Sequence, residues 1–232
     1  APTVVTVADA MNQPRFAAAD AANALLWDGK RHGHHESWSA IFHDRDSGAG
    51  FYLRHSLLAP KRQGGVTAGL FFGRFLPEAP DRGVALYREL PRDAFSFSAA
   101  PLQVRTGDGI LTSGLLRGSL SVGGHDASWD LSFQPALFVH RPLPDEFYAH
   151  PTLIDTLYLS PNPVIYVHGN VTVDRDRYLL DGGPAVQSHA WGHRWPHAWA
   201  RGHCAQFAED ATAGLEVISA RSRRLGLVGP SL

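Results

Sequence analysis

The stretch Gln187-Ser-His-Ala-Trp-Gly-His-Arg-Trp-Pro-His-Ala-Trp-Ala-Arg-Gly-His-Cys-Ala-Gln-Phe207 carries three of the six tryptophans and four of the thirteen histidines of this chain. Between His189 and Trp199, histidine and tryptophan occupy every odd position. Alternate residues of a strand point to opposite faces, so an extended chain would place all these rings on one face. The stretch therefore predicts a face of indoles and imidazoles on a strand.

The same rings are spaced by four residues, which would also stack them on one side of a helix. Pro196 lacks an N–H group and disfavours helical geometry at Trp195, and Gly192 weakens a helix further. We therefore predict extended structure, with a bend or bulge at Pro196 between two strands, because proline cannot donate to a central ladder.

The composition is that of a globular protein without a strong net charge. Of the 232 residues, 44% are hydrophobic and 19% are charged, and the net charge is −1. Such a balance gives no strong field to recruit nucleic acid or acidic lipid. We therefore expect no nucleic-acid partner. No apolar run approaches the roughly 20 residues of a membrane-spanning helix, so we also expect no stable membrane insertion. The single Cys204 excludes an internal disulfide. The oligomeric state and the compartment both stay open, with the cytoplasm slightly favoured.

Short strand-like segments alternate with Gly- and Asp-rich turns along most of the chain. Glu36–His43 and Phe51–Leu58 flank such a turn, which is typical of a hairpin. The further predicted strands are 66–75, 84–90, 94–97, 102–105, 115–122, 127–134, 164–173, 178–180 and 214–221. This rhythm predicts an all-β antiparallel barrel or sandwich, preceded by a short alanine-rich helix within 17–26.

A proline-rich connection interrupts the rhythm at 135–163. Six prolines fall within it, so we predict no regular structure there. We interpret the segment as a long connection that lies over an opening.

Two groups of histidines could carry chemistry. They comprise His189, His193, His197 and His203 with Cys204 in the first group, and His32, His34 and His35 in the second. The first group offers atoms of the kind that zinc binds, but no standard metal-site spacing is present, so we predict no metal. We interpret the second group as part of a solvated turn.

Indoles that share a face with imidazoles are typical of an apolar small-molecule site, although tryptophans can equally fill a core. A pocket is the better interpretation, because burying several imidazoles in a dry core is costly unless each has a partner. The predicted ligand-contacting residues are Trp38, Trp191, Trp195, Trp199 and His197.

The predicted catalytic residues are His189, His193 and Glu36. A carboxyl group beside tryptophans would have a raised pKa and could donate a proton; Asp130 and Asp155 are further candidates, with a solvent-facing turn carboxylate as the alternative for each. The chain has no nucleophile elbow, phosphate loop or dinucleotide fingerprint, so we expect no cofactor.

His189-Ala-Trp-Gly192 with Trp195 and Trp199, together with the Glu36-Ser-Trp38 strand and the hairpin at 44–54, resembles the lipocalin-like carotenoid hydratase (hydroxyneurosporene synthase) family. That family includes a yeast survival factor and fungal pericyclases. The resemblance covers mainly residues 27–58 and 185–221. It implies a lipocalin-like (calycin) antiparallel β-barrel and a hydrophobic isoprenoid, polyene or lipid-like ligand. We expect residues 189–199 to line part of the interior of this barrel, where the ligand would bind.

Family members typically have two barrels in tandem, and this chain is shorter. We therefore expect an N-terminal segment at 1–26, a barrel at 27–200, and the start of a second β-domain, or closing strands, at 201–232. The implied chemistry is acid-assisted hydration, cyclisation or isomerisation of an alkene. Tryptophan faces would stabilise a developing cation by about 0.5–2 kcal/mol each. The alternatives are a lipid carrier without chemistry and a His-ligated metalloprotein.

Overall fold

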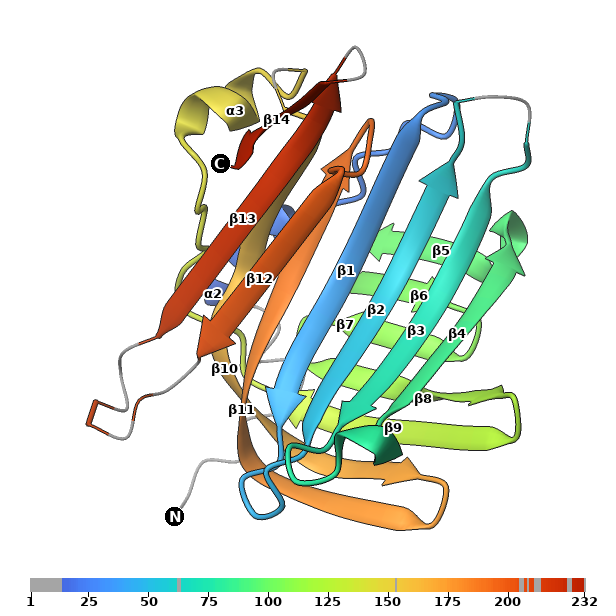
Figure 1. The fold of residues 1–232 in the computed structure, drawn as a ribbon, viewed down its shortest axis with the longest axis vertical. Helices are drawn as coiled ribbons and strands as arrows, with labels where there is room; N and C mark the ends of the chain where they lie inside the picture. Colours follow the sequence, from blue (N-terminus) through green and yellow to red (C-terminus); the bar gives the residue numbers. More distant parts are fainter. Residues whose placement is uncertain are drawn as a thin grey trace.

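The computed structural model describes residues 14–61, 64–152, 154–204, 207, 209–210, 214–224 and 227–231. The described residues form an 11-stranded antiparallel sheet that curls into a nearly closed barrel, and a separate 3-stranded sheet beside it (Figure 1). The all-β antiparallel barrel predicted from the sequence is confirmed.

The barrel strands are β1 (His34–His43), β2 (Gly50–Ala59), β3 (Thr67–Phe75), β4 (Val84–Pro91), β5 (Phe95–Ala99), β6 (Leu102–Thr106), β7 (Gly109–Thr112), β8 (Leu115–Val122), β9 (His125–Phe133), β10 (Thr156–Val173) and β11 (Asp176–Gly192). The small sheet holds β12 (Ala198–Cys204), β13 (Leu215–Arg224) and β14 (Leu227–Ser231). The helical elements are α2 (Pro14–Ala22), α3 (Asp145–Ala149) and the 3-10 turns η1 (Pro80–Arg82) and η2 (Arg92–Ala94).

The strand order in the barrel is β4-β3-β2-β1-β11-β10-β9-β8-β7-β6-β5. Strands that are neighbours in this order are also neighbours in the sequence, except that β11 returns to pair with β1. In that pairing Glu36 lies opposite Trp191, and Trp38 lies opposite His189. The two stretches singled out by the sequence therefore lie side by side.

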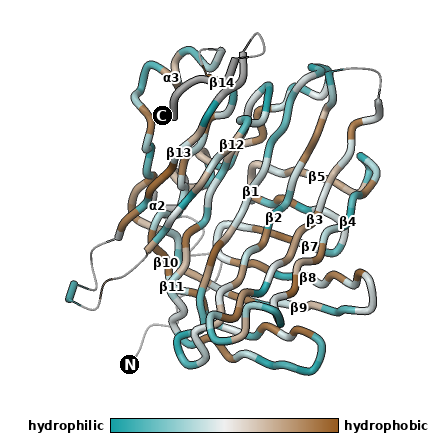
Figure 2. Tube along the Cα trace, viewed as in Figure 1, coloured by the Kyte–Doolittle hydropathy of each residue, from teal (hydrophilic) through white to brown (hydrophobic). Residues whose placement is uncertain are grey.

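Alternation along the strands separates the two faces of the barrel wall. Trp38, Ala40 and Phe42 of β1 are at most 1% exposed and pack in the barrel core with Phe51 and Leu53 of β2. The hairpin ends are hydrophilic, whereas the strands carry most of the hydrophobic positions (Figure 2). The core thus fills the barrel interior, and the odd-numbered residues of β1 face away from it.

The proline-rich connection contains more regular structure than the sequence predicts. Strand β10 begins at Thr156 and runs through Pro161 and Pro163, and its pairing with β11 shifts register on both sides of Asn162. The prediction of no regular structure was wrong there, and also for α3. Prolines are tolerated in a strand at bulges, where no N–H group is required for the ladder.

The aromatic stretch is extended at both ends but is not a single strand. β11 ends at Gly192 and β12 begins at Ala198. The predicted bend at Pro196 between two strands is confirmed, whereas the prediction of one continuous aromatic face was wrong because the chain leaves the sheet between the two strands. The predicted strand at 214–221 is confirmed as part of β13. None of the described helices is long and apolar enough to span a membrane.

Candidate functional site

Glu36 lies on the interior face of β1 and is fully buried. Its carboxylate accepts hydrogen bonds from the backbone N–H groups of Leu26 (2.8 Å) and Trp27 (3.0 Å). It also contacts Nε2 of His34 at 2.8 Å and Nε2 of His189 at 3.0 Å. Burial alone would raise the pKa of Glu36, but the hydrogen bonds from the two histidines outweigh it and lower this pKa to about 2.

His189 connects this carboxylate to the N-terminal segment. Its Nδ1 lies 2.8 Å from the carbonyl oxygen of Ala22, so both ring nitrogens face acceptors and both can donate only when the ring carries a positive charge. The ring stacks on Trp38 at 4.9 Å between centroids, and the indole N–H of Trp38 donates to the carbonyl of Asn23. The cluster therefore holds the chain after α2 against β1 and β11.

Two expectations for this region were wrong. The pKa of Glu36 is lowered and not raised, because four donors surround its carboxylate. His34 and His35 do not lie in a solvated turn; each is 3% exposed at the start of β1. Arg31 contacts Nδ1 of His34 at 2.8 Å, and His35 stacks on Trp195 at 3.8 Å between centroids.

A cavity of about 480 Å³ lies on the opposite face of β1 and β11, between the barrel wall and the small sheet. The walls are mostly apolar, with polar groups at a few positions. The main lining residues are Ser37, Ser39, Tyr52, Arg54, Leu143, Ile154, Asp155, Tyr158, Ala190, Trp195, Trp199, Arg201, Glu216, Ile218 and Ala220.

A hydrogen-bonded group made of Glu216, Tyr158, Arg201 and Ser188 forms the most polar part of this wall. The Tyr158 hydroxyl donates to Glu216 at 2.6 Å, and Arg201 donates to the same carboxylate at 2.7 Å and 2.9 Å. Arg201 also donates to the hydroxyl of Ser188 at 2.8 Å. Burial, with the charge of Glu216, raises the pKa of Tyr158 far above its ordinary value despite the opposing charge of Arg201, so this phenol stays neutral.

Asp155 is a second acid of the cavity and is 2% exposed. Its carboxylate lies 3.4 Å from Nε2 of His193, and its backbone carbonyl accepts the N–H of His193 at 3.1 Å. The pair places an imidazole beside a buried carboxylate where the chain leaves β11. Asp130, the other candidate acid, is exposed and pairs with Arg117 at 3.0 Å.

The structure divides the sequence-predicted site residues between the two faces of the barrel wall. Glu36, Trp38 and His189 lie together inside, and the Trp191 ring is 5.0 Å from that of His189. Trp195 and Trp199 line the outer cavity, and His193 binds Asp155. His197 is exposed, and its backbone N–H donates to the carbonyl of Arg221.

Sequence reasoning missed Tyr158, Glu216, Arg201 and Arg54 as cavity residues. Nothing in their local sequence marks them, because Tyr158 lies in the proline-rich connection and the others are single polar positions on strands. The outward-facing serines of β1, Ser37 and Ser39, were the available signal, since small polar residues leave room against a strand.

The first histidine group is not assembled into one site. Its members contact separate partners: His189 contacts Glu36, His193 contacts Asp155, and His203 contacts the carbonyl of Pro163. Among the residues that the structure describes, no group of three or more His, Cys, Asp or Glu side chains is arranged to hold a metal ion.

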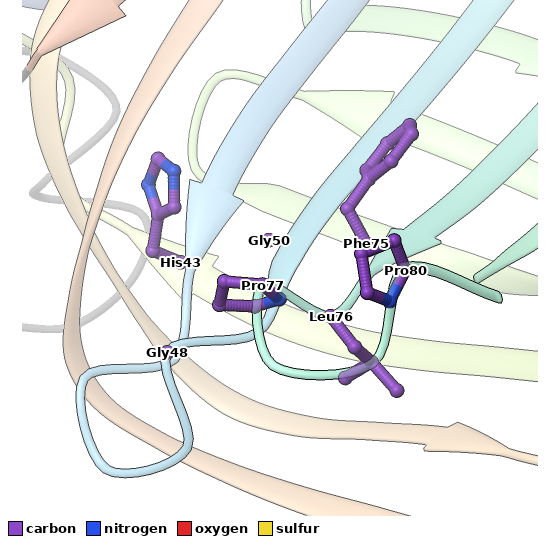
Figure 3. Close-up of a pocket in the computed structure, with 7 residues that line it drawn as sticks. All are labelled: His43, Gly48, Gly50, Phe75, Leu76, Pro77 and Pro80. Atoms are coloured by element: carbon purple, nitrogen blue, oxygen red, sulfur yellow. The ribbon is translucent and has the colours of Figure 1, made fainter. Parts of the chain in front are cut away.

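A second hollow of about 380 Å³ lies at the end of the barrel, between the β1–β2 loop and the segment after β3 (Figure 3). It is lined by His43, Gly48, Gly50, Phe75, Leu76, Pro77 and Pro80. Figure 3 shows the imidazole of His43 and the ring of Phe75 on opposite sides of Gly50 and Pro77. With one imidazole as its only polar side chain, it offers little to orient a ligand.

No protein-family model matches this chain, and no curated protein matches it. Solved structures do. The crystal structure of an AttH-type protein from Nitrosomonas europaea aligns with a TM-score of 0.52 at 13% identity, covering 89% of this chain and 71% of that one. Kievitone hydratase from Nectria haematococca aligns with a TM-score of 0.47 at 12% identity, covering 84% of this chain and 63% of that one. The chain therefore shares the barrel fold of the AttH-type protein.

Proposed function

We propose that this protein binds a hydrophobic small molecule of the isoprenoid, polyene or lipid-like class in the cavity between the barrel wall and the small sheet. The observation that carries the proposal is the lining of that cavity, in which Trp195, Trp199, Leu143 and Ile218 surround a few polar groups. Ligand sites are typically built in this way. The volume of about 480 Å³ falls within the roughly 300–1,000 Å³ that such sites occupy.

The proposed position differs from the one expected from the sequence. Large side chains fill the barrel interior, among them Trp38, Phe42, Phe51 and Phe72, each at most 1% exposed. The outer face of the same two strands supports the proposal better, because it offers open volume beside two of the predicted ligand-contacting tryptophans.

Titration with retinol, an isoprenoid polyene that quenches tryptophan fluorescence, tests the proposal. Ala220→Phe adds bulk to a residue that lines the cavity, whereas Ala200→Phe adds the same bulk at an exposed position of β12. We expect saturable quenching in the wild type and in Ala200→Phe, and a loss of affinity of about tenfold or more in Ala220→Phe. Equal affinity in the two variants, or no quenching across a panel of polyenes and fatty acids, would reject the site.

Catalysis is the finer part of the proposal. His193 is the best placed of the predicted catalytic residues, because its ring lies 3.4 Å from Asp155, which lines the cavity, whereas Glu36 and His189 face the packed interior. In this role His193 would give a proton to an alkene carbon. Water would then add to the cation with loss of a proton, or a neighbouring carbon would lose a proton in isomerisation.

Incubation of a polyene panel with the protein in D2O reports this step without knowledge of the product. Hydration and isomerisation would both leave deuterium bound to a carbon atom of the polyene, and mass spectrometry detects this added mass. We expect incorporation in the wild type and none in His193→Gln, with retinol binding retained in both. Incorporation that persists in His193→Gln would exclude His193 as the proton donor, and none in the wild type would favour a carrier.

A further inference from the structure

We infer that the ligand of the cavity is an amphipathic acid whose carboxylate is bound by Arg54. This inference rests on the proposed binding function and narrows its ligand class. Arg54 lies on the outer face of β2 and lines the cavity. Its cross-strand neighbours are Ser39 on β1 and Phe71 on β3.

The guanidinium of Arg54 has no anionic partner in the part of the chain that the structure describes. Its Nε is buried and makes no hydrogen bond with any described residue. Its guanidinium carbon lies 5.5 Å from the centroid of the Phe71 ring, a cation–π contact. A guanidinium whose Nε is buried without a hydrogen-bond partner is costly, because polar groups removed from water need a partner.

Arg201, Glu216 and Asp155, the other charged side chains of the lining, have partners among the described residues. Arg201 pairs with Glu216 at 2.7 Å, and Asp155 lies 3.4 Å from His193. Arg54 is therefore the cation of the lining left without an acid. A ligand anion would supply the missing counter-charge.

The surroundings of Arg54 select the type of anion. A guanidinium presents parallel N–H groups that match the two oxygens of a carboxylate, and Ser39 beside it adds a hydroxyl donor. The rest of the lining, with Leu143, Trp199 and Ile218, suits a hydrocarbon body. A ligand with one carboxylate on a hydrocarbon chain therefore fits both the polar group at Arg54 and the apolar part of the lining.

Retinoic acid and retinol test this inference, because the two molecules share one isoprenoid polyene body and differ in the head group. Fluorescence titration at pH 8 should show retinoic acid binding at least about tenfold more tightly than retinol, since hydrogen bonds to charged groups are the stronger ones. Arg54→Gln should abolish this preference by weakening the binding of retinoic acid, and Arg54→Lys should keep part of it. Arg105→Gln, at an exposed position of β6, is the matched control.

Each outcome separates the inference from the proposed function. Equal affinity for the two ligands in the wild type, or a preference that survives Arg54→Gln, overturns the inference and leaves the binding function standing. Absence of binding by either ligand rejects the binding function itself. If circular dichroism shows that Arg54→Gln is unfolded, methyl retinoate decides with the wild type alone: an ester that binds as tightly as the acid overturns the inference.

Discussion

One carboxylate organises the interior of the barrel at the scale of single residues. Glu36 gathers two backbone N–H groups from the segment after α2 and two imidazoles, one from its own strand and one from β11. These partners lie 2 to 153 residues from Glu36 along the chain. Because no described side chain other than Glu36 bonds to all of them, we assign Glu36 a structural role in place of the catalytic role predicted from the sequence.

Glu36→Gln should destabilise the protein severely. The substitution removes the charge that His189 and His34 face, and breaking a buried ion pair by removing one partner costs about 3–5 kcal/mol. Urea unfolding monitored by circular dichroism measures the loss. Asp130→Asn is the control, since the exposed Asp130–Arg117 pair should contribute no more than about 1 kcal/mol. Equal losses in both variants would contradict the structural role of Glu36.

The buried titratable groups should make the fold labile in acid. Burial lowers the pKa of His55 from 6.5 to about 4, so the unfolded chain takes up a proton before the folded chain does as the pH falls. Stability from His55 is therefore present above pH 6.5 and lost as the pH falls toward 4. The pKa of Glu36 is about 2 in the folded protein and 4.5 as its ordinary value, so Glu36 adds a further loss of stability as the pH falls from 4.5 toward 2.

His55→Leu should remove one step from this pH dependence. Between pH 7.5 and 4, the free energy of unfolding should decrease in both proteins. The decrease in His55→Leu should be smaller than in the wild type by roughly 3 kcal/mol, at about 1.36 kcal/mol per pKa unit. The dependence should not vanish, because burial also lowers the pKa of His35 to about 4. His32→Gln, at an exposed histidine, should leave the slope unchanged. A slope that is the same in all three proteins would refute the assignment to His55.

The sequence identified single residues better than their partners. The sequence motifs that contain Glu36 and His189 identified both residues as candidates. Neither motif, however, predicted which groups the two side chains would contact. The backbone donors of Leu26 and Trp27 have no sequence signature, because any residue supplies an N–H group. The lowered pKa of Glu36 depends on those partners, which explains why the expected direction was wrong.

At the scale of elements, the end of β11 depends on close backbone approach. A Cβ atom at Gly192 would lie 2.2 Å from the carbonyl oxygen of Asp155 and 3.0 Å from Nε2 of His35. The glycine therefore lets β11 and the start of β10 meet, and places His193 beside Asp155.

Gly192→Ala should destabilise the fold by about 1–3 kcal/mol, the usual cost of overpacking, because a backbone oxygen cannot move aside as a flexible side chain can. Gly202→Ala on β12 is the matched control, since no atom lies within 4 Å of the Cβ that it would add. Thermal unfolding of the two variants measures the difference. A Gly192→Ala protein as stable as Gly202→Ala would show that the approach at Asp155 is not tight.

Hairpins were the elements that the sequence predicted best. The pair β1 and β2, with its Gly- and Asp-rich turn, agrees with the prediction within a few residues, because local turn chemistry determines it. Strands β10 and β11 were predicted too short, since long pairing partners outweigh three prolines and three glycines in their interiors. Because this stabilisation comes from the partner strand, the local sequence of β10 or β11 does not predict it.

At the scale of the whole molecule, the pairing of β1 with β11 gives one wall two functions. Its inner face closes the barrel over the core, and its outer face forms one side of the cavity. The small sheet of β12 and β13 supplies the opposite side. The fold class could be predicted from strand rhythm, whereas the cavity could not, because it arises from the placement of one sheet against another. The predicted division into 1–26, 27–200 and 201–232 stays a prediction.

A ligand between two sheets should hold them together, and hydrogen exchange can locate it. When retinoic acid saturates the protein, amides of β12 and β13 and the outer wall at β1 should exchange more slowly, because separation of the sheets must then expel the ligand. Strands β6 to β8, on the other side of the barrel, serve as the internal control and should be unaffected (Figure 1). Protection of β6 to β8 with none in β12 and β13 would instead place the ligand inside the barrel, where the aromatic stretch first led us to expect it.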